Sequence, residues 1–277
     1  MRKTWLITGA SRGLGRALAQ AVLAAGDRLV ATARDPRALE DLAARHGDAV
    51  RLAALDVSDP VAAERAVALA VSAFGRLDVV VNNAGYGDVG SVEDTSLDDF
   101  RRQIETNLFG TIIVTKAAIP LLREQGSGHV IQLSSVGGRI GAPGRAPYSA
   151  AKWGVEGFSE SLALEMALVG VKVTIVEPGG FRTDFAGAST TLSAGQSAYD
   201  AVVGATARRQ AAYDGTQPGD PARAAQAILA VAAMDEPPLR LALGSDAVAI
   251  IRDTDQRRLA QLERWRDLSV STDFPAQ

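Results

Sequence analysis

Hydrophobic and polar positions divide the chain into short apolar runs and longer segments with helical periodicity. The apolar runs predict strands at residues 3–9, 27–33, 49–57, 76–85, 129–135, 171–180 and 238–244. Apolar positions that recur every three or four residues predict helices at 11–26, 35–47, 58–75, 97–125, 148–170, 221–234 and 245–270. The strands read as continuous apolar runs, so we expect helices on both faces of their sheet. This order predicts one α/β domain over residues 1–277, with a doubly wound parallel sheet.

Residues 184–220 depart from this pattern, because they are weakly apolar, poorly periodic and rich in alanine, serine and glycine. A long irregular segment within a compact α/β domain often covers a binding site, and a plain surface excursion is the alternative. We expect a helical substrate lid over 184–220 and a helical C-terminal extension over 245–277.

Composition excludes several kinds of chemistry and partner. The chain has no cysteine, and its two histidines, His46 and His129, are far apart, so we expect no metal site. A net charge of −3 with no run of like charge gives no basic surface for nucleic acid. No apolar span has membrane length, and the first apolar run is too short for a signal peptide, so we expect a cytoplasmic protein. The chemistry should therefore use oxygen and amine groups.

Three glycines separate the first predicted strand from the first predicted helix, in TGASRGLG at residues 8–15. A backbone without side chains can approach phosphate closely, and the N-terminus of a helix favours negative charge. The turn therefore predicts a dinucleotide site at the carboxyl ends of the strands in a Rossmann-type sheet. Its spacing, with Gly9, Gly13 and Gly15, differs from the commoner Gly-x-Gly-x-x-Gly.

With this turn, four further motifs give the chain a resemblance to the short-chain dehydrogenase/reductase family over about residues 4–185. They are NNAG at 82–85, Asn107 in ETNLFG, Ser135 thirteen residues before the Tyr148-x-x-x-Lys152 pair, and PGGFRT at 178–183. The resemblance implies an NAD(P)-dependent oxidoreductase that reduces an aldehyde or ketone to an alcohol, or catalyses the reverse. Two alternatives stay open. An enoyl reductase usually separates its tyrosine and lysine by more residues, and a non-catalytic dinucleotide sensor usually lacks one of the two.

Tyr148 and Lys152 share one face of a helix, four residues apart. A free phenol and a free ammonium titrate at about 10 and about 10.4, too high for proton transfer at neutral pH. The lysine and the oxidised nicotinamide both carry positive charge, which should lower the pKa of the phenol toward the range that acid–base catalysis needs. By resemblance Tyr148 is the general acid or base, Ser135 positions the substrate oxygen, Lys152 also holds the nicotinamide ribose, and Asn107 anchors a water on the proton route. Ser134 is a rival to Ser135, but its spacing to Tyr148 does not match.

By resemblance the dinucleotide contacts positions at the ends of several strands. They are Gly9, Ser11, Arg12, Gly13, Leu14, Gly15, Arg34, Asp56, Val57, Asn83, Ala84, Gly85, Tyr148, Lys152, Pro178, Gly179 and Thr183.

The second predicted strand favours NADP(H) over NAD(H). Ala33 stands where NAD-dependent members usually carry an acid, and the guanidinium groups of Arg12 and Arg34 suit a 2′-phosphate. Asp35 could bind the ribose instead, but Pro36 follows it and favours a helix-capping role.

The lid predicts the character of the substrate. It has no arginine or lysine before Arg208, so we expect a neutral, small-molecule carbonyl or alcohol substrate. Family members usually form dimers or tetramers through helices that correspond to 97–125 and 148–170, so we expect a homodimer or homotetramer.

Overall fold

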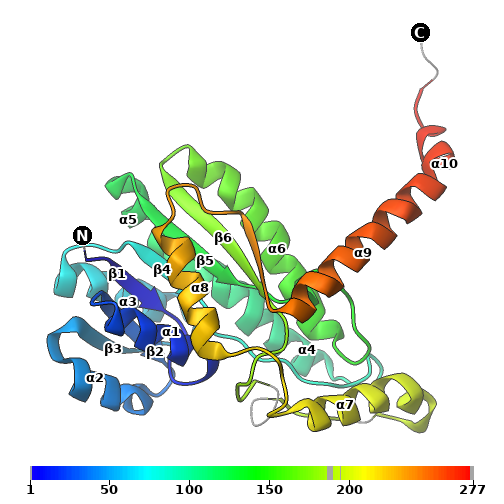
Figure 1. Cartoon of the computed structure of the whole chain (residues 1–277), viewed down its shortest axis with the longest axis horizontal. Coiled ribbons are helices and arrows are strands. Elements are labelled where there is room, and N and C mark those ends of the chain that lie inside the picture. Colours follow the sequence, from blue (N-terminus) through cyan, green and yellow to red (C-terminus); the bar gives the residue numbers. More distant parts are fainter. Residues whose placement is uncertain (1, 186–189, 194, 275–277) are drawn as a thin grey trace.

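The computed structural model describes residues 2–185, 190–193 and 195–274 of the chain. Within these ranges seven parallel strands form one sheet in the order β3-β2-β1-β4-β5-β6-β7 (Figure 1). The strands are β1 (Thr4–Ile7), β2 (Arg28–Ala33), β3 (Val50–Ala54), β4 (Val79–Asn82), β5 (Gly128–Leu133), β6 (Val171–Pro178) and β7 (Arg240–Leu243). After β3 the chain crosses from one side of β1 to the other, where β4 pairs with it. The sheet is therefore doubly wound, as predicted, and its strand order reverses between β1 and β4, where such sheets bind ligands.

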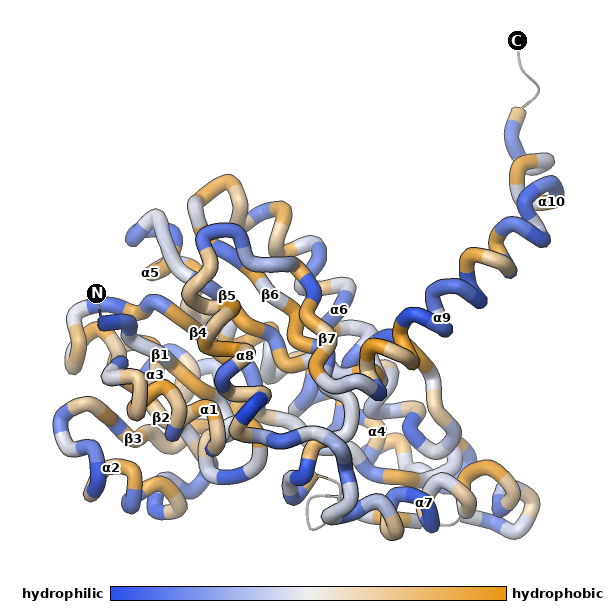
Figure 2. Tube along the Cα trace, viewed as in Figure 1, coloured by the Kyte–Doolittle hydropathy of each residue, from blue (hydrophilic) through white to orange (hydrophobic). Residues whose placement is uncertain are grey.

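Helices cover both faces of the sheet. One face packs against α1 (Gly13–Ala24), α2 (Glu40–His46) and α8 (Pro221–Ala233). The other packs against α3 (Pro60–Phe74), α5 (Gly110–Gln125) and α6 (Ala146–Ala167). All four residues of β4 are buried, with Val80 in the second core cluster and Val79 and Val81 in the first. Figure 2 shows hydrophobic residues concentrated along these central strands. Burial on both faces explains why the strands read as continuous apolar runs.

Several helix boundaries follow the predicted caps. The Asp59 carboxylate accepts hydrogen bonds from the backbone N–H groups of Val61 and Ala62, at 2.9 and 3.2 Å, and Pro60 begins α3. The helix predicted over 97–125 is interrupted. It consists of α4 (Leu97–Ile104), a π-helical turn over Glu105–Phe109, and α5. Such π-helical turns often occur at functional sites.

The segment predicted as a lid is partly helical. A π-helical turn (Asp200–Gly204) precedes α7 (Ala205–Tyr213), and Leu192 forms a β-bridge with Val89. Residues 186–189 and 194 of this segment lie outside the described residues.

The C-terminal part is α9 (Ser245–Arg264) followed by α10 (Arg266–Val270), which project from the body of the molecule (Figure 1). The last three residues of the predicted extension, 275–277, are not among those described. None of the helices in the described ranges is long and apolar enough to cross a membrane.

Candidate active site

A cavity of about 1110 Å³ lies at the carboxyl ends of the strands. The glycine turn after β1 lines one end of it, and Ser135, Tyr148 and Lys152 line the middle. Phe185 and Thr190, which belong to the lid segment, line the far side. Residues predicted from separate motifs therefore share one cavity.

The glycine turn is held by the segment after β4. Gly9 and Gly13 have φ angles of +64° and +57°, a region that favours glycine. The Asn83 side-chain amide donates to the carbonyls of Thr8 (2.9 Å) and Gly9 (3.1 Å), and a Cβ on Gly15 would collide with this amide. The Thr8 hydroxyl accepts in turn from the backbone N–H of Asn83, at 2.9 Å. Sequence reasoning missed Thr8, although its position next to the glycine turn was a signal.

The two arginines predicted to bind a 2′-phosphate both line the cavity. Arg12 and Arg34 are exposed, line the cavity, and form no ion pair with any carboxylate of the described residues. By contrast, the Asp35 carboxylate accepts from the backbone N–H of Arg37 (3.0 Å) and pairs with its guanidinium (2.8 Å). Asp35 is thus engaged as the cap of the short helix that precedes α2.

Asp56 and Val57 lie along the same end of the cavity, after β3. Hydrogen bonds from the hydroxyl and backbone N–H of Ser58, at 2.6 and 3.0 Å, hold the pKa of Asp56 below its usual range, and the charge of Arg34 lowers it further. Val57 is buried against Gly110 of α5.

Tyr148 is buried, with 8% of its surface exposed, in a narrow slot between two glycines. A Cβ on Gly87 would lie 2.7 Å from Cδ2 of the ring, and one on Gly137 would lie 3.0 Å from Cε1. The Phe185 ring lies at 5.6 Å, centroid to centroid. These neighbours fix the orientation of the phenol.

The two candidate serines face different surroundings. The Ser135 hydroxyl accepts a hydrogen bond from the Gly137 N–H at 3.1 Å. A Cβ on Gly137 would lie 3.5 Å from the Ser135 Oγ and 3.0 Å from Cε1 of Tyr148, so the two side chains border the same glycine. The Ser134 hydroxyl is buried beside Gly138 and Glu156, away from the phenol. The structure therefore brings Ser135, and not Ser134, to Tyr148.

Lys152 and Asn107 meet at Gly85. The Lys152 ammonium donates to the Leu133 carbonyl at 2.6 Å, and it lies 5.9 Å from the centroid of the Tyr148 ring. A Cβ on Gly85 would lie 3.7 Å from that nitrogen and would collide with the Asn107 side chain. Asn107 lies in the π-helical turn, and its amide donates to the Tyr86 carbonyl at 2.9 Å.

Burial dominates the proton equilibria of the site. It lowers the pKa of Lys152 to about 8, against a partly opposing effect of Glu156. It raises the pKa of Tyr148, while the hydrogen bond with Ser135 and the charge of Arg145 lower it. The expected lowering of the phenol pKa is therefore not present in the protein by itself, where Arg145 is the cation that acts on Tyr148. The positive charge of the oxidised nicotinamide, the other charge expected to lower this pKa, would act only when the dinucleotide is bound.

The PGGFRT turn after β6 is clamped from two sides. The Gly180 N–H donates to the Asp246 carboxylate at 2.7 Å, and the Tyr213 hydroxyl packs against the same glycine. Thr183 lies against the glycine turn, 3.5 Å from where a Cβ of Gly13 would be. Pro178 and Gly179 also line the cavity. Asp246, from the first turn of α9, was missed because no motif marks it.

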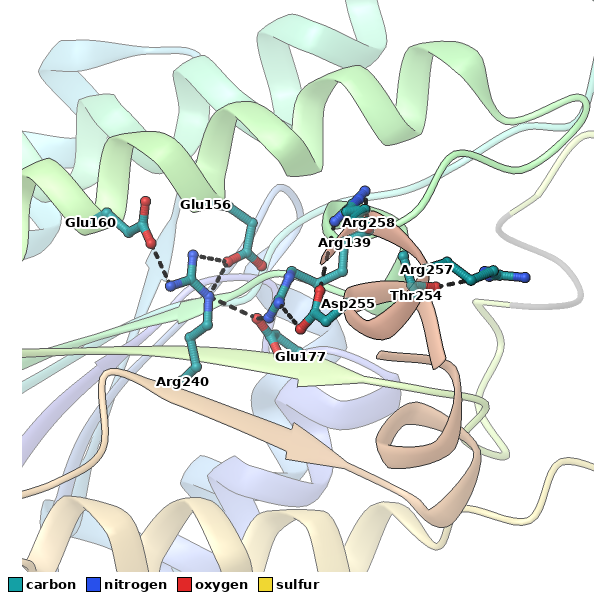
Figure 3. Close-up of polar contacts among 9 residues, drawn as sticks. All are labelled: Arg139, Glu156, Glu160, Glu177, Arg240, Thr254, Asp255, Arg257 and Arg258. Carbon is teal, nitrogen blue, oxygen red and sulfur yellow. Dashed lines mark hydrogen bonds and ion pairs between the residues drawn. The ribbon is translucent and has the colours of Figure 1, made fainter. Parts of the chain in front are cut away.

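A network of charged side chains lies behind this turn (Figure 3). Glu177 at the end of β6 accepts from Arg139 (3.0 Å) and Arg240 (3.1 Å), and Arg240 also pairs with Glu156 of α6 (3.0 Å). Arg139 pairs with Asp255 of α9 at 2.7 Å. The network connects the loop after Ser135 to β6, β7, α6 and α9. Its members are distant in sequence, so no local pattern could predict it.

Comparisons with known proteins give consistent results. Residues 3–192 match the family model described as short chain dehydrogenase. The chain is 47% identical over 273 residues to the oxidoreductase BOA17 of Botryotinia fuckeliana, with 98% of this chain and 100% of that protein covered.

Solved structures give the same picture. A short-chain dehydrogenase from Streptomyces avermitilis superposes with a TM-score of 0.91 at 42% identity, covering 99% of this chain and 100% of that one. An alcohol dehydrogenase from Thermococcus sibiricus, complexed with 5-hydroxy-NADP, has a TM-score of 0.73 at 28% identity, covering 88% and 96%. A 3-ketoacyl-(acyl-carrier-protein) reductase from Brucella melitensis, complexed with NADH, has a TM-score of 0.73 at 25% identity, covering 87% and 96%.

Proposed function

Because the chain belongs to the short-chain dehydrogenase/reductase family and is an NAD(P)-dependent enzyme of that family, we propose that it reduces an aldehyde or ketone to an alcohol, or catalyses the reverse, with NADP(H). One observation carries this proposal. Ser135 and Tyr148 line the same cavity and border the same glycine, Gly137, with the Lys152 ammonium on the same helix face as the phenol. A substrate oxygen held there would meet both a hydrogen-bond donor and a proton source.

The residues present suit a dinucleotide. The glycine turn opens its backbone toward the N-terminus of α1, and the Asn83 amide keeps it in that shape. All the positions assigned to the dinucleotide except Gly15 line one cavity. When bound, the nicotinamide supplies or accepts the hydride.

Side chains of the protein position the substrate and transfer the proton. Ser135 orients the substrate oxygen, and Tyr148 donates its proton to that oxygen during reduction or accepts one during oxidation. Lys152 binds the nicotinamide ribose through its ammonium, and the charge of Arg145 favours the ionised phenol. Asn107 holds the π-helical turn beside Lys152, where the family resemblance implies a proton-carrying water. The slot between Gly87 and Gly137 keeps the phenol aimed at the substrate.

The preference for NADP(H) rests on the two unpaired arginines. Arg12 and Arg34 offer guanidinium groups for a 2′-phosphate, while Asp35 is already bound by Arg37. NADPH and NADH are titrated into wild type, Arg34→Ala and Arg45→Ala, with intrinsic fluorescence as the readout. We expect Arg34→Ala to weaken NADPH binding about 10- to 100-fold and NADH binding much less, since a charge-assisted contact contributes about 1.5–3 kcal/mol. Arg45, outside the cavity on α2, is the matched control. Equal losses for both dinucleotides would reject the phosphate role.

We further propose that residues 184–220 act as a substrate lid and that the enzyme forms a homodimer or homotetramer. Phe185 packs on Tyr148 from the lid side, which supports the first proposal. Leu164 on α6 and Leu168, the residue after its end, are strongly exposed, and α6 is one of the helices expected at an interface, which supports the second. Light scattering of wild type and a Leu164→Glu/Leu168→Glu variant tests the assembly, and a monomeric wild type would refute it.

A further inference from the structure

A guanidinium that none of the assigned dinucleotide contacts accounts for lies beside the phenol, and its charge lowers the pKa of that phenol. Arg145 immediately precedes α6, three residues before Tyr148, and lines the cavity. It donates to the Gly87 carbonyl at 2.9 Å, and a Cβ on Gly87 would lie 3.3 Å from its Nη1. The same glycine borders the Tyr148 ring. Arg145 and the phenol are therefore neighbours at the substrate end of the cavity.

Two other partly buried arginines show how unusual the position of Arg145 is. Arg139 and Arg240 pair with buried carboxylates, and these pairs raise their pKa against the effect of burial. Arg145 forms no ion pair within the described part of the chain, and burial lowers its pKa. A partly desolvated charge without a partner is costly, so such groups in proteins are usually paired or bind a ligand.

The charges that act on Arg145 are those of the Tyr148 phenolate, when it forms, and of the Asp88 carboxylate, which does not form an ion pair with Arg145. The Asp88 carboxylate already accepts a hydrogen bond from the Thr191 N–H at 2.8 Å. Because the Asp88 carboxylate does not pair with Arg145, the guanidinium can bind one further negative charge. The charge of Asp88 would repel a doubly charged group more strongly than a singly charged one. A carboxylate meets this condition better than a phosphate dianion.

We propose that Arg145 binds a carboxylate of the substrate, so that the enzyme acts on oxocarboxylates or hydroxycarboxylates. The inference rests on the proposed carbonyl chemistry and names its substrate class. It replaces the expectation of a neutral substrate, which considered only the cations of the lid. The cation comes instead from Arg145, the residue immediately before α6. Ile140, Ala142 and Phe185 also line the cavity, so we expect the rest of the substrate to be apolar.

The test uses a series of oxocarboxylates from 4-oxopentanoate to 7-oxooctanoate, each beside its methyl ester. Reduction by NADPH is followed in wild type, Arg145→Met, Arg145→Lys and Arg208→Met. Arg208 is the matched control, since it lies on α7, is paired with Asp200 and does not line the cavity. The measured quantity is the ratio of kcat/KM for each acid to kcat/KM for its ester, because any effect of Arg145 on the phenol cancels in that ratio.

We expect the wild type to prefer the acid at one or more chain lengths, and Arg145→Met to lower that ratio about 10- to 100-fold. Arg145→Lys should recover part of it by keeping the charge, and Arg208→Met should leave it unchanged. A wild type that prefers the ester throughout, or a ratio that Arg145→Met does not move, overturns the proposal.

A binding measurement separates this inference from the proposed function. Calorimetry of the same acids with NADPH-loaded Tyr148→Phe, alone and combined with Arg145→Met, needs no turnover. If no acid or ester is reduced, the proposed reductase activity fails, and calorimetry alone decides the role of Arg145. Binding that disappears with Arg145→Met supports the carboxylate site, and absent or unchanged binding refutes it.

Discussion

Replacing Lys152 by methionine should alter the stability of the protein in a way that depends on pH. Lys152 is only 4% exposed, and burial lowers the pKa of its ammonium from 10.5 to about 8. Because the folded pKa is lower than the unfolded one, the unfolded chain binds more protons between these values. Lys152 therefore destabilises the fold fully below pH 8, and the penalty disappears as the pH rises toward 10.5.

The size of this penalty follows from the pKa difference. At about 1.36 kcal/mol for each pKa unit, the fall from 10.5 to about 8 corresponds to about 3 kcal/mol at pH 6. At pH 9.5 most of the penalty is gone, and about 1 kcal/mol remains. The methionine variant also loses the hydrogen bond to the Leu133 carbonyl, but a neutral amine can donate too, so this loss varies little with pH. The free-energy difference between wild type and Lys152→Met should therefore move by about 2 kcal/mol from pH 6 to pH 9.5.

Urea unfolding of both proteins at several pH values between 6 and 9.5, followed by circular dichroism, measures this difference. Lys116→Met provides the control, because Lys116 is exposed on α5 and its replacement should give a difference that stays constant. The stability advantage of Lys152→Met over wild type should be greatest at pH 6. A difference for Lys152→Met as constant as that of the control would refute the claim that the buried ammonium is desolvated.

Three further predictions concern activity and the lid. Tyr148→Phe should lower kcat/KM by at least about 100-fold, as expected for a general acid, with NADPH affinity nearly intact, and surviving activity would reject its role. The rate of carbonyl reduction in steady-state assays should fall as the pH rises through about 8, because Lys152 then loses its proton, and a profile flat to pH 10 would contradict this. Trypsin should cut at Arg208 and Arg209 in the free protein, and more slowly with NADPH and substrate bound, whereas unchanged cleavage indicates a static loop.

The sequence predicted the sheet and the glycine turn because both depend on local patterns. Buried strands leave continuous apolar runs, and the positive φ angles of Gly9 and Gly13 need glycine whatever surrounds them. The interruption of 97–125 by a π-helical turn could not be predicted, since one extra residue in a helix leaves the spacing of apolar residues nearly unchanged. The convergence of Asn107 and Lys152 at Gly85 also depends on that turn.

The pairing of charged side chains could not be predicted from the sequence, because it depends on contacts between distant segments. No local pattern distinguishes Arg139, which pairs with Glu177 and Asp255, from Arg145, which pairs with neither. In the sequence both are arginines of one glycine-rich loop between β5 and α6. The expectation of a neutral substrate considered only the cations of the lid, whereas the proposed carboxylate site uses Arg145, three residues before Tyr148.

The buried charged side chains fall into two groups, those that form ion pairs and those that do not, and we assign a structural role to the first group and a ligand-binding role to the second. Glu156 and Glu177 are nearly inaccessible, and Arg240 binds both of them while it joins β7 to α6 and β6 (Figure 3). These ion pairs stabilise the packing of β6, β7 and α6 behind the PGGFRT turn. Lys152 and Arg145, by contrast, donate hydrogen bonds to backbone carbonyls, those of Leu133 and Gly87, and burial lowers the pKa of both. Because a desolvated cation stabilises a fold poorly, this contrast supports the proposed ligands, a ribose for Lys152 and a carboxylate for Arg145. In the proposed complex Lys152 binds the ribose and Arg145 binds the carboxylate, while Tyr148, which lies between them in the chain, transfers the proton to the reacting oxygen.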